Sequence, residues 1–275
     1  MIRRSLLPVL LAVWASAPVT DAVVTFYDNG APNLMNGFEF THWKVTNQFT
    51  LGADVVTNTV KFWEIEARAN VWANQVLWEI RSNSASNLPG TVLFSGSSTN
   101  LSRVATSRQD SSNFPEYLIT FDLPSVSLPA GTYWLTLHNG ALSNNMPPGY
   151  VFWETATSNR TDDSKSDEAP FSNNWETNTA DAQHPSQLAF QLIGIVRPRV
   201  SSFGFTSGAP RVSFTTVTGQ NYRVEFKNNL TDVSWSTVSG ASTVAGTGGV
   251  VQISDSDPNV SNGTIKHRFY RVIVL

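Results

Sequence analysis

The stretch Gln75-Val-Leu-Trp-Glu-Ile-Arg81 decides the fold class, because apolar residues recur in it at every second position. Successive side chains of an extended strand point to opposite faces, so Val76, Trp78 and Ile80 are predicted to face a core. The same period of two recurs at 117–123, 132–138 and 188–192. The residues expected to point inward there are Tyr117, Ile119, Phe121, Leu123, Tyr133, Leu135, Leu137, Leu188, Phe190 and Leu192.

Turn-forming clusters separate these stretches. Gly and Pro occur together at 88–90, 128–131 and 147–149, where they favour tight reversals of the chain. No window of a dozen residues shows an apolar stripe at helical spacing. Short strands joined by such turns predict an all-β fold built as antiparallel sandwiches.

The strand pattern predicts two domains. We expect a larger, jelly-roll-like β-sandwich at 23–194, a linker at 195–202, and a smaller immunoglobulin-like or fibronectin-like sandwich at 203–275. The smaller one is expected to contain strands at 211–216, 222–227, 250–254 and 267–275, with Tyr222 and Trp235 in its core. The segment 155–187 is expected to be the longest irregular one.

Residues 1–22 have the pattern of a secretory signal peptide. Arg3 and Arg4 precede an apolar run at 6–14 that is too short to span a bilayer, and cleavage is expected after Ala17 or Ala22. No second apolar run has membrane length. The sequence therefore predicts a secreted or cell-surface protein without a transmembrane segment after leader removal. The alternative is an N-terminal membrane anchor.

Composition excludes several classes of function. Charged residues make up 14% of the chain, its formal charge is −3, and it has no cysteine. A weakly acidic chain without a basic stripe is a poor candidate for binding nucleic acid. Disulfides, thiolate catalysis and cysteine-ligated metals are excluded as well. We expect no cofactor, with Ca²⁺ as the alternative.

Tryptophans are the first candidate ligand-binding residues. Trp72, Trp134 and Trp175 stand among polar neighbours or on the strand face opposite the expected core. Exposed rings of this kind can stack on sugar rings, and nearby amides and hydroxyls can bond sugar hydroxyls. Packing in a wide core is the alternative interpretation, and it fits Trp78 well.

An acidic segment is the candidate cation site. It contains Asp162, Asp163, Asp167 and Glu168, and such carboxylates suit Ca²⁺. The spacing does not match an EF-hand loop, so a solvated acidic loop is the preferred interpretation.

Catalytic patterns are absent from the sequence. No histidine spacing indicates a metal site, and there is no nucleophile elbow or phosphate-binding glycine loop. Glu64 and Glu66 lie on one face of their strand, about 7 Å apart, but neighbours on one strand seldom form the two sides of a cleft. We therefore expect no catalytic residues.

Both halves resemble modules of exported bacterial proteins. The second half has Tyr222-Arg-Val-Glu-Phe226, Trp235, Asp255 and Arg268-Phe-Tyr-Arg-Val272 in order. It is similar to a C-terminal β-sandwich module that ends on an "rFYRV" strand. The first half has Tyr27-Asp-Asn-Gly30, Trp78-Glu-Ile80, Ala130-Gly-Thr-Tyr-Trp-Leu135 and Ala189-Phe-Gln-Leu192. It resembles the sandwich that precedes a PEP-CTERM sorting tail, without that tail. Neither resemblance implies a catalytic activity.

The sequence thus predicts a secreted, non-catalytic protein that binds carbohydrate or a cell-envelope component. The alternative is a structural, matrix or adhesion spacer protein, and the third hypothesis is a polysaccharide hydrolase. Oligomeric state stays open.

Overall fold

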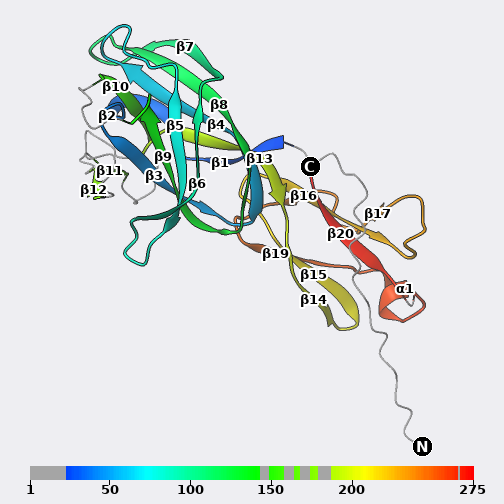
Figure 1. The fold of residues 1–275 in the computed structure, drawn as a ribbon. Coiled ribbons are helices and arrows are strands. Elements are labelled where there is room, and N and C mark those ends of the chain that lie inside the picture. Colours follow the sequence, from blue (N-terminus) through cyan, green and yellow to red (C-terminus); the bar gives the residue numbers. More distant parts are fainter. Residues whose placement is uncertain (1–22, 143–148, 158–163, 168–173, 179–186, 266) are drawn as a thin grey trace, which may run out of the picture. The chain divides into compact units, whose positions relative to one another are not determined.

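Almost all regular structure in this chain is β-strand (Figure 1). The computed structural model describes residues 23–142, 149–157, 164–167, 174–178, 187–265 and 267–275. The helix within these ranges, α1 (Pro258–Ser261), has four residues. The expected all-β fold with antiparallel sheets is confirmed. No helix in the described ranges has the length and apolar character to span a membrane.

Internal contacts divide the chain into two units. The larger unit comprises Val24–Leu51 and Val56–Gly194, and the smaller unit includes Gly52–Val55 and Ile195–Leu275. Most of the range 195–202, expected as a linker, is strand. It contains the end of β13 (Phe190–Arg197) and the start of β14 (Val200–Thr206).

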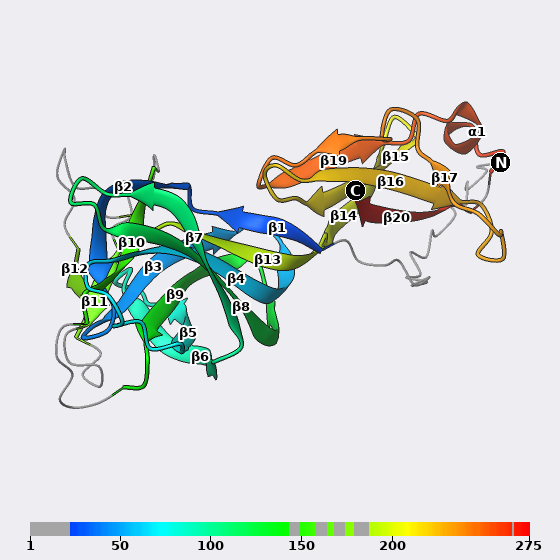
Figure 2. The same cartoon turned by 90° about the horizontal axis from the view of Figure 1, so that it is seen from above.

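Two sheets form the larger unit (Figure 2). One runs in the order β1 (Val23–Asp28), β13, β4 (Asp54–Glu66), β10 (Val151–Thr157) and β2 (Ala31–Glu39), and β8 (Pro115–Leu128) joins β4 to β7 (Leu101–Gln109). The other runs in the order β12 (Glu176–Thr177), β11 (Lys165–Asp167), β3 (Lys44–Leu51), β9 (Gly131–Asn139), β5 (Val76–Asn83) and β6 (Pro89–Ser98).

Aromatic rings dominate the core of the larger unit. Phe62 meets Phe40, Phe121 and Trp153 with ring centroids 5.7, 6.2 and 5.9 Å away, each near edge-to-face. The inward faces predicted for 75–81 and 117–123 are confirmed, because their alternate apolar residues are buried apart from the half-buried Tyr117.

The segment 155–187 is not irregular throughout, which corrects the expectation. Thr155 to Thr157 continue β10, and β11 pairs antiparallel with β3, Ser166 lying opposite Val45. Backbone pairing at an open sheet edge makes this segment a strand although it has no apolar alternation.

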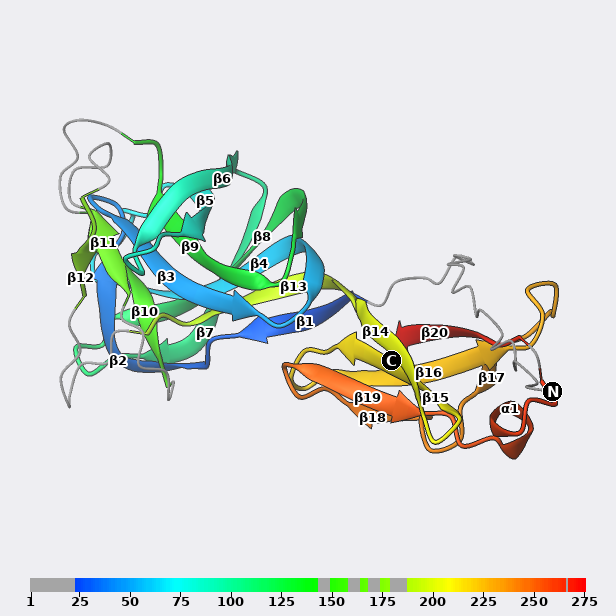
Figure 3. The same ribbon diagram turned by 90° about the horizontal axis from the view of Figure 1, so that it is seen from below.

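The smaller unit has a three-stranded and a four-stranded sheet (Figure 3). The first contains β14, β15 (Ala209–Thr215) and β19 (Val250–Ser254). The second contains β17 (Ser236–Thr237), β16 (Asn221–Lys227), β18 (Val244–Ala245) and β20 (Phe269–Val274), with β20 paired to β16. The four strands expected from the sequence are present within one or two residues of the predicted ends.

The core of this unit confirms one expected aromatic residue and corrects another. Tyr222 is fully buried and packs with Phe214. Trp235 is only half-buried and lies beside the cations of Lys227 and Arg271. It belongs to the surface because it follows β16 in a turn-rich segment, outside the strands that enclose the core.

Candidate functional site

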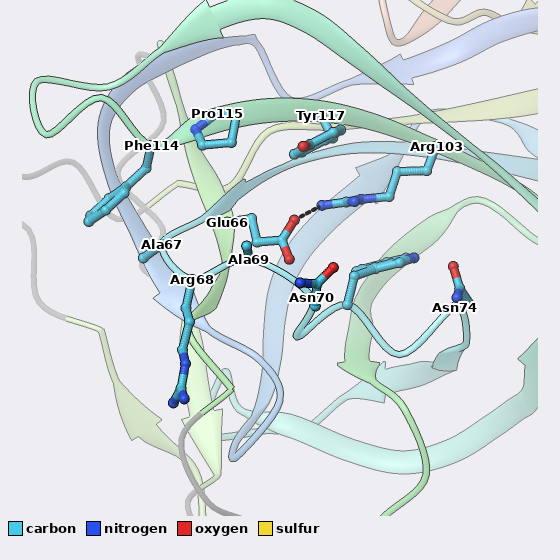
Figure 4. A pocket seen from close by; sticks show the side chains of 11 residues that line it. Glu66, Ala67, Arg68, Ala69, Asn70, Asn74, Arg103, Phe114, Pro115 and Tyr117 are labelled. Carbon is cyan, nitrogen blue, oxygen red and sulfur yellow. Dashed lines mark hydrogen bonds and ion pairs between the residues drawn. The ribbon is translucent and has the colours of Figure 1, made fainter.

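A cavity of about 450 Å³ opens where β4, β7 and β8 meet the 67–75 loop (Figure 4). We call it the Trp72 pocket and define it by six of the residues that line it: Glu66, Asn70, Trp72, Asn74, Arg103 and Tyr117. Its volume lies in the range of small-ligand sites, and its walls combine aromatic and polar side chains. Trp72 is the expected ligand-binding tryptophan that lines it.

Arg103 organises the pocket. Its Nε and Nη2 both donate to Glu64 Oε1, at 2.8 and 2.6 Å, and its Nη2 also reaches Glu66 Oε2. The guanidinium carbon lies 3.5 Å from the centroid of the Tyr117 ring and 5.2 Å from that of Trp72. Figure 4 shows the guanidinium extended toward Glu66 beside the Tyr117 ring. Stacking and charge together hold this side chain in one position.

Buried Asn139, at the end of β9, fixes the loop that carries Trp72. Its Oδ1 accepts from the backbone N–H of Ala73 at 3.0 Å, and its Nδ2 donates to the carbonyl of Val71 at 3.4 Å. The N–H of Val71 donates to Glu66 Oε1 at 3.2 Å. Both neighbours of Trp72 are thus hydrogen-bonded, so the backbone that carries the indole is held in place.

Glu64 lies behind the pocket and has no exposed surface. Burial raises its pKa to about 7, because desolvation of the carboxylate outweighs its attraction to Arg103. Its Oε2 has no hydrogen-bond partner among the described residues. A carboxyl group that changes charge near neutrality therefore adjoins the wall of the pocket.

Indole Nε1 of Trp72 is the second unpaired polar atom at this site. It is buried within a half-buried residue and has no hydrogen-bond partner in the described part of the chain. Buried donors are nearly always paired in proteins, so an unpaired donor beside a cavity calls for a ligand or water. The exposed amides of Asn70 and Asn74 at the rim can bond hydroxyl groups of a molecule that contacts the rings.

The expectation that Trp134 presents an exposed ring is wrong. Trp134 is 1% exposed, and its Nε1 donates to Asn83 Oδ1 at 2.8 Å. It lies on the central strand β9, opposite Gln48 of β3 and Arg81 of β5, which are both buried. The face of β9 that points away from the core is therefore covered as well, which two-residue periodicity cannot reveal.

Trp175 lies on the six-stranded sheet and does not line the Trp72 pocket. Its half-buried ring has Lys44 Nζ 5.3 Å and Arg81 Cζ 5.1 Å from the ring centroid. Trp134 is buried, and Trp175 does not line the pocket that Trp72 lines. The three candidate tryptophans therefore do not form one platform. Ligand binding by Trp175 stays a prediction.

The candidate cation site is described only at Asp167. Asp162, Asp163 and Glu168 lie outside the described residues. Asp167 is fully buried, and its Oδ2 is 3.6 Å from Lys44 Nζ, so for this residue the expectation of a solvated acidic loop is wrong. Within the described ranges, no group of three or more His, Asp or Glu residues could hold a metal ion.

Sequence reasoning missed Arg103 and the placement of Tyr117. Tyr117 was expected to face inward, and it lies near the start of β8, where it lines the pocket. Arg103 belongs to a strand of small and polar residues, and no local pattern singles it out. A charged residue on the inward face of a strand is the signal that could have identified it, once the pairing of Arg103 with Ile119 was known.

Comparison with family models and with curated proteins gives no relative from which a function could be transferred. No family model matches the chain, and no curated protein matches it.

Proposed function

We propose that this chain is an exported, non-catalytic β-sandwich protein that binds carbohydrate, such as a polysaccharide or an envelope glycan, through the Trp72 pocket. The observation that carries the proposal is the half-buried ring of Trp72, which lines an open cavity beside polar side chains and the Tyr117 ring. Sugars combine apolar ring faces with hydroxyl groups, and the pocket offers aromatic surface beside amide, carboxylate and guanidinium groups. The leader pattern at 1–22 supports export.

A binding role fits the two acidic residues better than hydrolysis does. Glycosidases place one carboxyl group on each side of the scissile bond. Here Glu64 and Glu66 belong to one strand, and the same guanidinium bonds both of them. They therefore stand on one wall, and purified protein is expected to release no reducing ends from polysaccharides.

The test compares matched tryptophan variants. We expect Trp72→Ala to weaken binding to cello-, xylo-, manno- or chito-oligosaccharides by about tenfold or more, the value of one lost stacking and hydrogen-bonding contact. Trp235→Ala is the matched control, because Trp235 is equally half-buried but lies in the smaller unit. Equal affinities for both variants, with the fold intact, would contradict the proposal.

A second candidate function is assembly, and strand β6 is the observation that favours it. β6 ends the six-stranded sheet, and Val92, Leu93 and Phe94 on it are exposed in succession. Exposed apolar edge strands are templates for pairing with another chain. If light scattering shows concentration-dependent assembly that Leu93→Lys abolishes, and no glycan binds, a structural role replaces the binding role.

A further inference from the structure

A second cavity adjoins the Trp72 pocket. It measures about 550 Å³ and lies between the middle of β2 and the 110–114 turn. Ala67 and Phe114 line both cavities, so the two cavities meet at these residues. We call the second cavity the Tyr150 pocket, after the aromatic residue at its rim, and define it by Leu34, Met35, Asn36, Asp110, Phe114 and Tyr150.

Exposed apolar side chains distinguish the Tyr150 pocket. Met35 is 53% and Tyr150 43% exposed, so both side chains can contact a molecule in this cavity. The guanidinium carbon of Arg68 lies 5.9 Å from the centroid of the Tyr150 ring, and Arg68 also lines the Trp72 pocket. A side chain that lines the Trp72 pocket thus lies beside an aromatic ring of the Tyr150 pocket.

Arg68 differs from the other arginines described in the larger unit. Arg81, Arg103 and Arg108 each pair with a glutamate. Arg68 is exposed, and among the described residues its guanidinium lies beside the ring of Tyr150 without an acidic partner. Its guanidinium donors are therefore available at the junction of the two pockets, where they can bond ligand oxygens.

Backbone strain is concentrated around the same two cavities. Leu34 and Tyr150 have φ values of 57° and 59°, and Asn70 and Asn74 have 64° and 52°. All four residues line one of the two pockets. The left-handed region is unfavourable for Leu and Tyr, and such strain collects at functional sites. Here hydrogen bonds hold it in place: the N–H of Ala67 donates to the carbonyl of Tyr150 at 2.8 Å, and the N–H of Leu34 donates to Glu154 Oε1 at 2.6 Å.

From this continuity we infer that the two pockets form one groove that binds consecutive sugar units of an extended glycan chain. One unit lies against Trp72, a later unit lies against Tyr150, and Arg68 bonds the chain between them. The inference rests on the proposed carbohydrate binding and deepens it, because it assigns the ligand as a chain and not as a single terminal sugar.

The experiment measures affinity against chain length, with the oligosaccharide series of the glycan type that binds, from disaccharide to hexasaccharide. We expect affinity to rise by about tenfold or more along the series as the second pocket fills. Tyr150→Asn, which suits the left-handed backbone, is expected to remove this rise and to leave disaccharide affinity unchanged. Met35→Ser is the second variant and is expected to reduce the rise.

The outcomes separate this inference from the proposal beneath it. Affinity that does not depend on chain length, or a length dependence that survives Tyr150→Asn and Met35→Ser, would overturn the inference and leave carbohydrate binding standing. Absence of binding by every oligosaccharide, at every length, would overturn both. Phe94→Ser is the control, because Phe94 is exposed on β6 outside both pockets, and it is expected to bind like the unchanged protein.

Discussion

Two arginines of this chain are built into similar clusters, one in each unit. Arg103 lies on Tyr117 and bonds Glu64 and Glu66, whereas Arg268 lies 3.9 Å from the centroid of the Phe226 ring. Arg268 donates to Asp255 at 2.6 Å, to Asp257 at 2.7 Å and to Asn228 at 3.0 Å. Each cluster therefore combines one guanidinium, one aromatic face and two carboxylates.

The clusters differ in what they leave unpaired. The Arg268 side chain is 2% exposed, and Asp255 also accepts from the hydroxyl of Tyr270 at 2.8 Å. The side chains of the Arg268 cluster leave no buried polar atom unpaired within the described residues. The Arg103 side chain is 20% exposed, adjoins a cavity, and leaves one oxygen of Glu64 unpaired. A closed network stabilises a fold, and an open one is prepared for a ligand.

The largest expected effect breaks the closed cluster. Arg268→Ala leaves the buried Asp255 carboxylate without its cation, so we expect a loss of about 3–5 kcal/mol in the free energy of unfolding of the smaller unit. Chemical denaturation combined with limited proteolysis measures it. Arg223→Ala is the control, because its ion pair with Glu225 is more exposed, and it is expected to cost less than about 1 kcal/mol. If Arg268→Ala costs as little stability as the Arg223→Ala control, the Arg268 cluster is not structural.

The next effect uses pH to probe the open cluster. With a pKa of about 7 in the folded state against an ordinary value of 4.5, Glu64 retains its proton better in the folded protein than in the unfolded one. The contribution of Glu64 to the free energy of unfolding is therefore largest below pH 4.5. It falls by about 3 kcal/mol as the pH rises to about 7 and above. Urea denaturation across this range is expected to show a fall in the free energy of unfolding that becomes smaller, by the share of this group, in Glu64→Gln. Glu154, whose pKa burial raises to about 8, gives a similar slope in both proteins. Identical slopes in the two proteins would refute the assignment to Glu64.

Arg103→Ala sharpens the contrast between the clusters. Glu64 can take up a proton when its cation is removed, so we expect a loss of about 2 kcal/mol at pH 8 and a smaller one at pH 5, where Glu64 is already neutral. The free energy of unfolding at the two pH values is the measurement. A loss that is the same at both would mean that Arg103 acts through packing alone.

The smallest effect on stability concerns the loop that carries Trp72. Asn139→Ala removes the acceptor of the Ala73 N–H, and we expect a cost of about 1–2 kcal/mol. Glycan affinity is expected to fall together with stability, because the indole is no longer held in place. Unchanged affinity in a destabilised variant would separate the loop from the site.

The sequence could predict strands and cores but not the Arg103 cluster. Alternation placed Val76, Trp78 and Ile80 inward because a period of two is a local property. The spacing of Glu64 and Glu66 likewise put them on one face. Their partner Arg103 comes from a strand nearly forty positions away in the chain, and no local pattern encodes that pairing. Trp134 was misassigned for the same reason, since the residues that cover it belong to neighbouring strands.

The most direct test of the account is the indole region of a ¹⁵N–¹H NMR spectrum during titration with the oligosaccharide panel, with the Trp72 cross-peak assigned by Trp72→Phe. The account predicts a saturable shift of the Trp72 peak, because its ring lines the pocket and its Nε1 has no hydrogen-bond partner among the described residues. The peaks of Trp134 and Trp153 should stay in place, since their Nε1 groups already donate to Asn83 and to the Ala189 carbonyl. A Trp72 peak that does not move with any oligosaccharide would contradict carbohydrate binding in this pocket.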